Sequence, residues 1–211
     1  MSCCDHNCGA PAPEDGYRRI LWVALAVNAG MFFVEIVASV LAGSVSLRAD
    51  ALDFLADAAN YAVALLVVGL ALRWRARAAL LKGAVMGLFG LWVAGSTIHH
   101  AIVATVPHAG MMGAVGFAAL GANLATAGLL YRYRTGDSQA MSVWLCSRND
   151  CIANIAVMLA GAGVWLSGSA WPDIAVAAVI AALGLSSAAR IIGRARGELR
   201  EAPAALGAAA E

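Results

Sequence analysis

Three aspartates share one stripe of an apolar segment. Asp50, Asp53 and Asp57 are separated by three and four residues, which places them on one face of a helix. Another apolar segment carries Cys146 and Asp150, four residues apart and again on one face. Carboxylates and a thiolate in this arrangement are ligands for a divalent cation, and mixed oxygen and sulfur ligands suit zinc and related ions. The spacing therefore predicts a metal site between two helices.

The depth of these residues agrees with a single site. An aspartate at the centre of a membrane helix costs about 2.5–3.5 kcal/mol on insertion scales, so each one needs a function or a partner. With a rise of about 1.5 Å per residue and a hydrocarbon core of about 30 Å, four side chains fall near the midplane. These four predicted metal ligands are Asp53, Asp57, Cys146 and Asp150.

Composition shows which elements must position these residues. Apolar residues make up 62 % of the 211 residues and charged residues only 13 %, with a net charge of +1. That excludes a soluble domain, a disordered chain and a basic nucleic-acid binder. Hydropathy indicates six helical spans, because a segment in lipid must satisfy its own backbone hydrogen bonds. The predicted spans cover residues 18–41, 47–72, 79–104, 110–131, 138–166 and 173–193. We predict an all-α membrane protein, a bundle of six transmembrane helices joined by short connectors.

Basic residues set the predicted orientation. Twelve of the fourteen lie on one side of the predicted spans, and loops rich in Lys and Arg stay in the cytoplasm. These twelve are Arg18, Arg19, Arg73, Arg75, Arg77, Lys82, Arg132, Arg134, Arg190, Arg194, Arg196 and Arg200. Both termini are therefore expected in the cytoplasm. Residues 1–16 are predicted to form an N-terminal tail without a signal peptide, 17–196 the membrane domain and 197–211 a short C-terminal tail. The predominance of arginine over lysine indicates a bacterial protein of the inner (plasma) membrane.

Two motifs resemble those of the cation diffusion facilitator family. Residues 43–53 followed by Asp57 are similar to that family's second helix, with its SLxADAxHxxxD-like pattern. Residues 145–150 followed by Asn154 are similar to the HxxxD signature of its fifth helix. The resemblance covers residues 17–196. Polar residues also stand where that family keeps them, namely Asn28, Glu35, Pro172 and Asp173.

The resemblance implies a six-helix secondary transporter that exports divalent metal from the cytoplasm in exchange for protons. Its central site would be the four predicted ligands named above. Cys146 stands where most of the family has histidine or aspartate, which softens the site and favours zinc, with cadmium or cobalt as further substrates. The chain ends soon after the last predicted helix, so the resemblance implies a short form without the usual C-terminal cytoplasmic domain. A homodimer is left open.

The chemistry of the ligands predicts how transport would be driven. Carboxylates and a thiol must lose protons to bind metal, so protons and metal compete for one site. The sequence has no phosphate-binding GxxxxGK[ST] motif, so we expect no nucleotide, no prosthetic group and no nucleic acid. The partners are divalent metal ions, protons and the lipid bilayer. A channel or metal-sensing membrane protein that binds the cation without pumping it stays open. An intramembrane metalloenzyme is disfavoured, since four protein ligands leave no position for water.

Further residues have weaker predicted roles. The N-terminal cluster of Cys3, Cys4, His6 and Cys8 either captures metal or belongs to an unstructured tail. An access or proton path is predicted through Asn28, Glu35, Asp50, His99, His100 and Asn154. His108 lies near the same predicted outer end as His99 and His100 and either receives exported metal or is a histidine of the membrane interface. Gly83 and Gly87 form a GxxxG motif, which favours close packing against the last helix.

Overall fold

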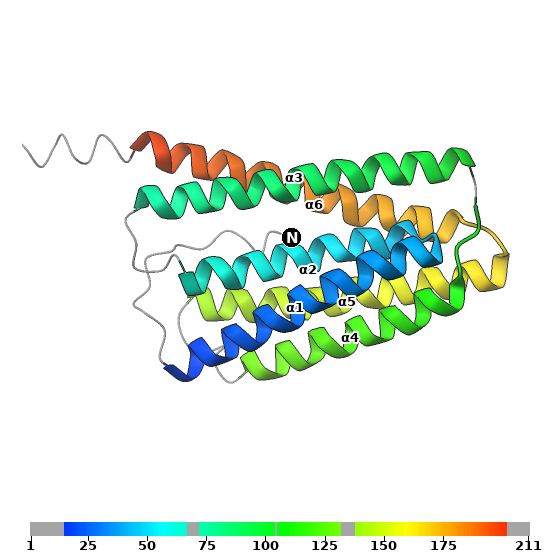
Figure 1. Cartoon of the computed structure of the whole chain (residues 1–211), viewed down its shortest axis with the longest axis horizontal. Helices are drawn as coiled ribbons and strands as arrows, with labels where there is room; N and C mark the ends of the chain where they lie inside the picture. The colour runs from blue at the N-terminus through cyan, green and yellow to red at the C-terminus, as the bar shows by residue number, and fades with distance from the viewer. Residues whose placement is uncertain (1–14, 67–71, 104, 132–137, 202–211) are drawn as a thin grey trace, which may run out of the picture.

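The part of the chain that the structure describes folds into six α-helices, each antiparallel to the next (Figure 1). The computed structural model describes residues 15–66, 72–103, 105–131 and 138–201, and for residues 138–149 it describes the helix without the side chains. The helices are α1 (Asp15–Ala42), α2 (Val45–Leu66), α3 (Leu72–Val103), α4 (Ala109–Tyr131), α5 (Ser138–Ser167) and α6 (Trp171–Glu201). These described residues include no strand. The predicted class, an all-α bundle of six helices, is confirmed.

α2 differs from the other helices in both composition and position. Within the described residues, five helices are long and apolar enough to cross a membrane, and α2 is not one of them. Arg48 and the three aspartates fall within its first thirteen residues. However, α2 contacts α1, α3, α5 and α6, so the other helices shield it from lipid. The helix that carries these four charged residues thus lies at the centre, where its charged side chains can find partners.

The helices form a ring of four and a separate pair. α1 contacts α2 and α4, and α5 contacts the same two helices, which closes the ring α1–α2–α5–α4. α3 packs on α6, and the two lie side by side along one flank of the bundle (Figure 1). This pair reaches the ring through contacts of α2 with α3 and α6 and of α5 with α6. The predicted ligands therefore belong to two helices of the same ring.

The α3–α6 seam is built from small residues. A Cβ atom at Gly83 would lie only 2.8 Å from Ile192 Cγ1, and one at Gly87 would lie 3.8 Å from Ala188 Cβ. Without those side chains the two backbones approach closely, which is how helices associate where no hydrophobic effect drives them together. The predicted role of the GxxxG motif is confirmed, and its partner is α6 of the same chain.

Asp173 joins α6 to the start of α2. Its buried carboxylate accepts hydrogen bonds from the backbone N–H groups of Val45 (2.8 Å) and Ser46 (3.0 Å) and from the Ser44 hydroxyl (2.7 Å). The first N–H groups of a helix have no partner within the helix, and a carboxylate there is well placed to accept from them. Asp173 therefore anchors the helix that carries the aspartate stripe.

Two predicted boundaries need correction. Residues 73–78, predicted as a connector, form the first turns of α3, and α6 continues to Glu201 rather than ending near residue 193. Arginine and alanine favour helix, and the Arg77 guanidinium lies over the Trp74 ring at 5.0 Å. Hydropathy marks where lipid ends, whereas the helices extend beyond it. α1 begins and α6 ends at the same end of the bundle (Figure 1). We call this the basic end.

Candidate metal centre

The Asp57 and Asp150 side chains meet inside the ring. Asp57 is 7 % exposed, and its carboxyl interacts directly with that of Asp150 across the α2–α5 contact. The Tyr61 hydroxyl donates to Asp57 Oδ2 at 3.4 Å. Two carboxyls so close in a buried site repel each other unless a proton or a cation is shared between them. This pair is the part of the predicted site that the structure brings together.

The other two predicted ligands lie on the same two helices. Asp53 is half-buried on α2, one turn from Asp57 away from the basic end. Cys146 lies on α5, one turn before Asp150, and its side chain is outside the described residues. Among the side chains that the structure describes, no three of the types His, Cys, Asp or Glu gather tightly enough to hold an ion. The full four-ligand set therefore stays a prediction.

Lys82 approaches the carboxyl pair from outside the ring. Its ammonium donates a hydrogen bond to Asn60 Oδ1 across the α2–α3 contact, and its positive charge acts on Asp57. Sequence reasoning used Lys82 only to assign the cytoplasmic side. The position of Asn60, three residues after Asp57, was a signal that the polar stripe continues. Nothing in the sequence indicated which residue of α3 would face it.

Glu35 and Asp50 form a second pair of buried carboxyls, farther from the basic end. Glu35 on α1 is 0 % exposed and Asp50 on α2 is 1 % exposed, and the Glu35 carboxyl faces Asp50. Within the described part of the chain, no donor bonds either Glu35 oxygen or Asp50 Oδ2. The charge of Asp53 also acts on Glu35. Carboxyls thus extend from the Asp57–Asp150 pair toward the other end of α2.

Two of the predicted polar residues lie buried among the ring helices. Asn28 on α1 donates from Nδ2 to the Ala24 carbonyl at 2.8 Å. Asn154 on α5 is 0 % exposed, and among the described residues its amide has no hydrogen-bond partner. It lies one turn beyond Asp150, so its side chain is near the carboxyl pair and can still accept or donate.

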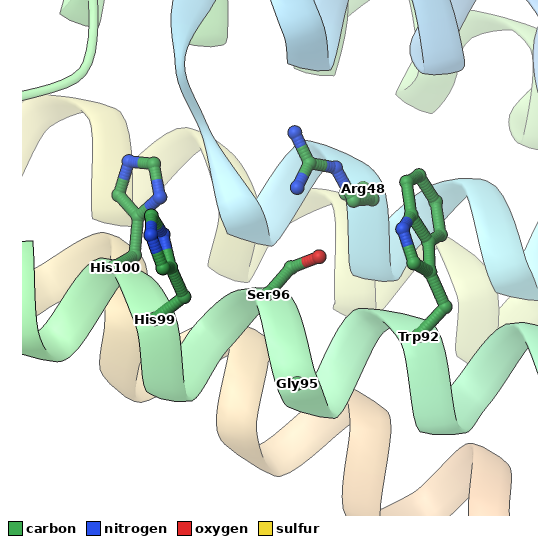
Figure 2. A pocket seen from close by; sticks show the side chains of 6 residues that line it. All are labelled: Arg48, Trp92, Gly95, Ser96, His99 and His100. Atoms are coloured by element: carbon green, nitrogen blue, oxygen red, sulfur yellow. The ribbon is translucent and has the colours of Figure 1, made fainter.

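His99 and His100 line an open pocket away from the ring interior. The pocket, of about 360 Å³, is also lined by Arg48, Trp92, Gly95 and Ser96 (Figure 2). His108 is not part of this lining, and its Nδ1 accepts from the backbone N–H of Met111 at 3.2 Å. The predicted N-terminal capture residues, Cys3, Cys4, His6 and Cys8, lie outside the described residues.

The family follows from a match over most of the chain. A sequence model of the cation efflux transmembrane domain matches residues 21–199. That range takes in all four predicted ligands and all of the ring except the first residues of α1. The chain belongs to the cation efflux family.

Two relatives agree with this membership. The zinc transporter ZitB of Escherichia coli (strain K12) is 28 % identical over 208 residues, an alignment that covers 92 % of this chain and 66 % of that protein. The protein of the same name from Shigella flexneri matches to the same extent. The chain thus spans just under two thirds of the length of these relatives. Membership of the cation efflux family agrees with a multi-pass membrane protein, since five of the described helices are long and apolar enough to cross a membrane.

Proposed function

We propose that this protein exports divalent transition-metal cations, zinc foremost, from the cytoplasm in exchange for protons. The observation that carries the proposal is the pair of Asp57, which is buried, and Asp150, which is half-buried, formed across α2 and α5 inside the ring. Asp53 and Cys146 complete the site in this proposal. Its support is that both flank the pair on the same two helices.

Electrostatics favours a cation as the substrate. The ring interior holds carboxyls from three helices, and charged acids in a membrane need positive charge or protons nearby. A thiolate among the ligands favours soft or borderline ions over magnesium and calcium, which prefer oxygen alone. Two relatives are named zinc transporters, which supports zinc, with cadmium and cobalt as further candidates.

Proton coupling follows from the ligands themselves. The site holds either metal or protons, so a change of access between the two sides would exchange one for the other. Glu35 and Asp50 extend the line of carboxyls away from the basic end, and we assign to them the proton and release path on that side. In this orientation the basic end faces the cytoplasm, with both termini inside, as the positive-inside rule requires.

Lys82 supplies a positive charge when metal is absent. Its ammonium is held by Asn60 next to Asp57, where it partly neutralises the carboxyl pair. An arriving divalent cation would compete with this tethered charge for Asp57. We therefore assign to Lys82 the role of weakening metal binding enough to permit release.

Flux measurements in proteoliposomes test the proposal. With an imposed pH gradient, zinc movement and opposite proton movement should appear together, recorded by a zinc dye and a pH dye in the same vesicles. Asp57→Ala and Asp150→Ala should abolish both signals. Glu198→Ala, which removes a half-buried carboxylate paired with Arg194 on α6, is the matched control and should transport normally.

The same assay separates the alternatives. A channel would pass zinc down its gradient without opposite proton movement, and a sensor would bind zinc without flux. Either result would reject antiport while leaving the metal site in place. Undiminished zinc flux in both aspartate variants would reject the site itself.

A further inference from the structure

The pocket that His99 and His100 line has an arginine above it. The pocket lies between α2 and α3, near the end of the bundle opposite the basic end. Its residues come from the first turn of α2 and the last turns of α3. Figure 2 shows Arg48 reaching from α2 over Ser96, with Trp92 on one side and the two histidines on the other. All the other lining residues come from α3.

Arg48 has a positive charge and no anionic partner of its own in the described part of the chain. There its guanidinium makes no hydrogen bond or ion pair, and its Nε is buried without a partner. It lies 5.0 Å from the centroid of the Trp92 ring. Asp173 is near enough for its charge to act on Arg48, but its oxygens are occupied by the first N–H groups of α2.

The remaining polar groups of the pocket can donate hydrogen bonds. Ser96 offers a hydroxyl and His99 an imidazole, while the His100 Nε2 is paired with the Thr105 hydroxyl at 2.9 Å. A guanidinium above such donors attracts an anion and repels a metal ion. The pocket is therefore better suited to an anion than to a metal cation. The sequence alone predicts that His99 and His100 belong to an access path for the cation.

The surroundings of the pocket indicate which anion. α3 residues on either side expose large apolar side chains, among them Leu91, Ile98 and Ile102, and such a surface in this bundle faces lipid. Trp92 is also half exposed, and tryptophan is typical of the level of the lipid headgroups. We propose that this pocket binds the phosphate group of a phospholipid of the outer leaflet, with Arg48 as its counter-charge and Ser96 and His99 as donors.

Binding to the purified full chain tests this site. Phosphatidylglycerol and a diacylglycerol with the same acyl chains, which lacks only the phosphate and headgroup, would be titrated and bound lipid counted by native mass spectrometry. Saturable binding of the phospholipid alone is expected. Arg48→Gln should weaken it by about tenfold or more, because a charge-assisted hydrogen bond to phosphate is lost. Arg190→Gln, an exposed arginine at the basic end, should leave binding unchanged.

A second variant guards against a folding defect in the first. Ser96→Ala combined with His99→Gln keeps the Arg48–Trp92 contact and should weaken binding by a few fold, with an unchanged thermal transition. Equal binding of diacylglycerol, or full binding by Arg48→Gln, would overturn the proposal. Binding of inorganic phosphate but not of phosphatidylglycerol would overturn the assignment to lipid. None of these results depends on whether the carboxyl pair transports metal.

Discussion

The interior of the ring and the α3–α6 seam are built on opposite chemical principles. The ring encloses four carboxyls in two facing pairs, Glu35 with Asp50 and Asp57 with Asp150. The seam is made of glycine, alanine and branched apolar side chains, with Gly83 and Gly87 against α6. Both regions lie within the membrane part of one small protein.

This difference suggests that the α3–α6 seam contributes to the stability of the fold and the ring interior to its function. Small residues in the seam let two helices pack by close contact, which stabilises the fold and offers no group that binds an ion. Buried acids that face each other do not stabilise a fold, since their charges repel and desolvation disfavours ionisation. In the proposed function these acids bind the cation, so substitutions in the ring should lower transport and substitutions in the seam should lower stability.

The largest effect is expected in the ring. Asp57→Asn should reduce zinc transport by about a hundredfold or more. Mutating a residue that only hydrogen-bonds to a metal ligand already lowers metal affinity or activity by about 10–100-fold, and Asp57 is a predicted ligand itself. The thermal transition in detergent should stay unchanged or rise, because one of two facing carboxyls becomes neutral. Glu198→Gln is the control, because it also replaces a carboxylate by an amide but outside the ring. If transport falls only because Asp57→Asn unfolds the protein, the proposed separation of function in the ring from stability in the seam is wrong.

The seam should give the reverse result. In Gly83→Leu the new side chain would overlap Ile191 and Ile192, where a Cβ alone already comes to 3.1 and 2.8 Å. Overpacking of this kind typically costs about 1–3 kcal/mol, measured as a lower thermal transition, while the folded fraction keeps its transport per molecule. Gly193→Leu is the matched control, because a Cβ at that position of α6 meets nothing within 4 Å. If Gly193→Leu destabilises as much, close packing at the seam is not the cause.

A smaller effect is expected where the two regions meet. Lys82 belongs to α3 but acts on Asp57 of the ring, and Lys82→Met would remove its charge with little change of length. Zinc should then bind about five- to thirtyfold more tightly by calorimetry, since the repulsion from a unit charge several ångströms away in a partly buried site is about 1–2 kcal/mol. Lys82→Arg keeps the charge and should bind as the wild type does. If Lys82→Met binds zinc with the same affinity as the wild type, Lys82 does not weaken metal binding at Asp57.

Spacing along one helix could be predicted from the sequence. The aspartate stripe of α2, the Cys146–Asp150 pair of α5 and the glycines of α3 each follow from a period of about 3.6 residues. Six helices followed from hydropathy, and that prediction was confirmed even though α2 is too charged to qualify as a span by composition. The shared face of its aspartates predicted the metal site.

Contacts between helices could not be predicted in the same way. Asp173 binds the start of α2 from a position 127–129 residues further along the chain, and Lys82 meets Asn60 across 22 residues. Arg48 is not among the twelve basic residues that set the predicted orientation, and packing places it beside the α3 residues of the pocket. Each contact depends on which faces of two helices meet, and hydropathy along one chain does not contain that information.

X-ray absorption at the zinc edge tests the central claim most directly. The full chain with Cys3, Cys4 and Cys8 changed to serine would be loaded with one zinc ion, so that the N-terminal thiols cannot contribute sulfur. The account predicts one sulfur neighbour at about 2.3 Å with oxygen neighbours at about 2.0–2.2 Å, and loss of the sulfur signal in the further variant Cys146→Ser. A shell of oxygen and nitrogen alone, or a sulfur signal that survives Cys146→Ser, would contradict a four-ligand site in which Cys146 completes the set of aspartates.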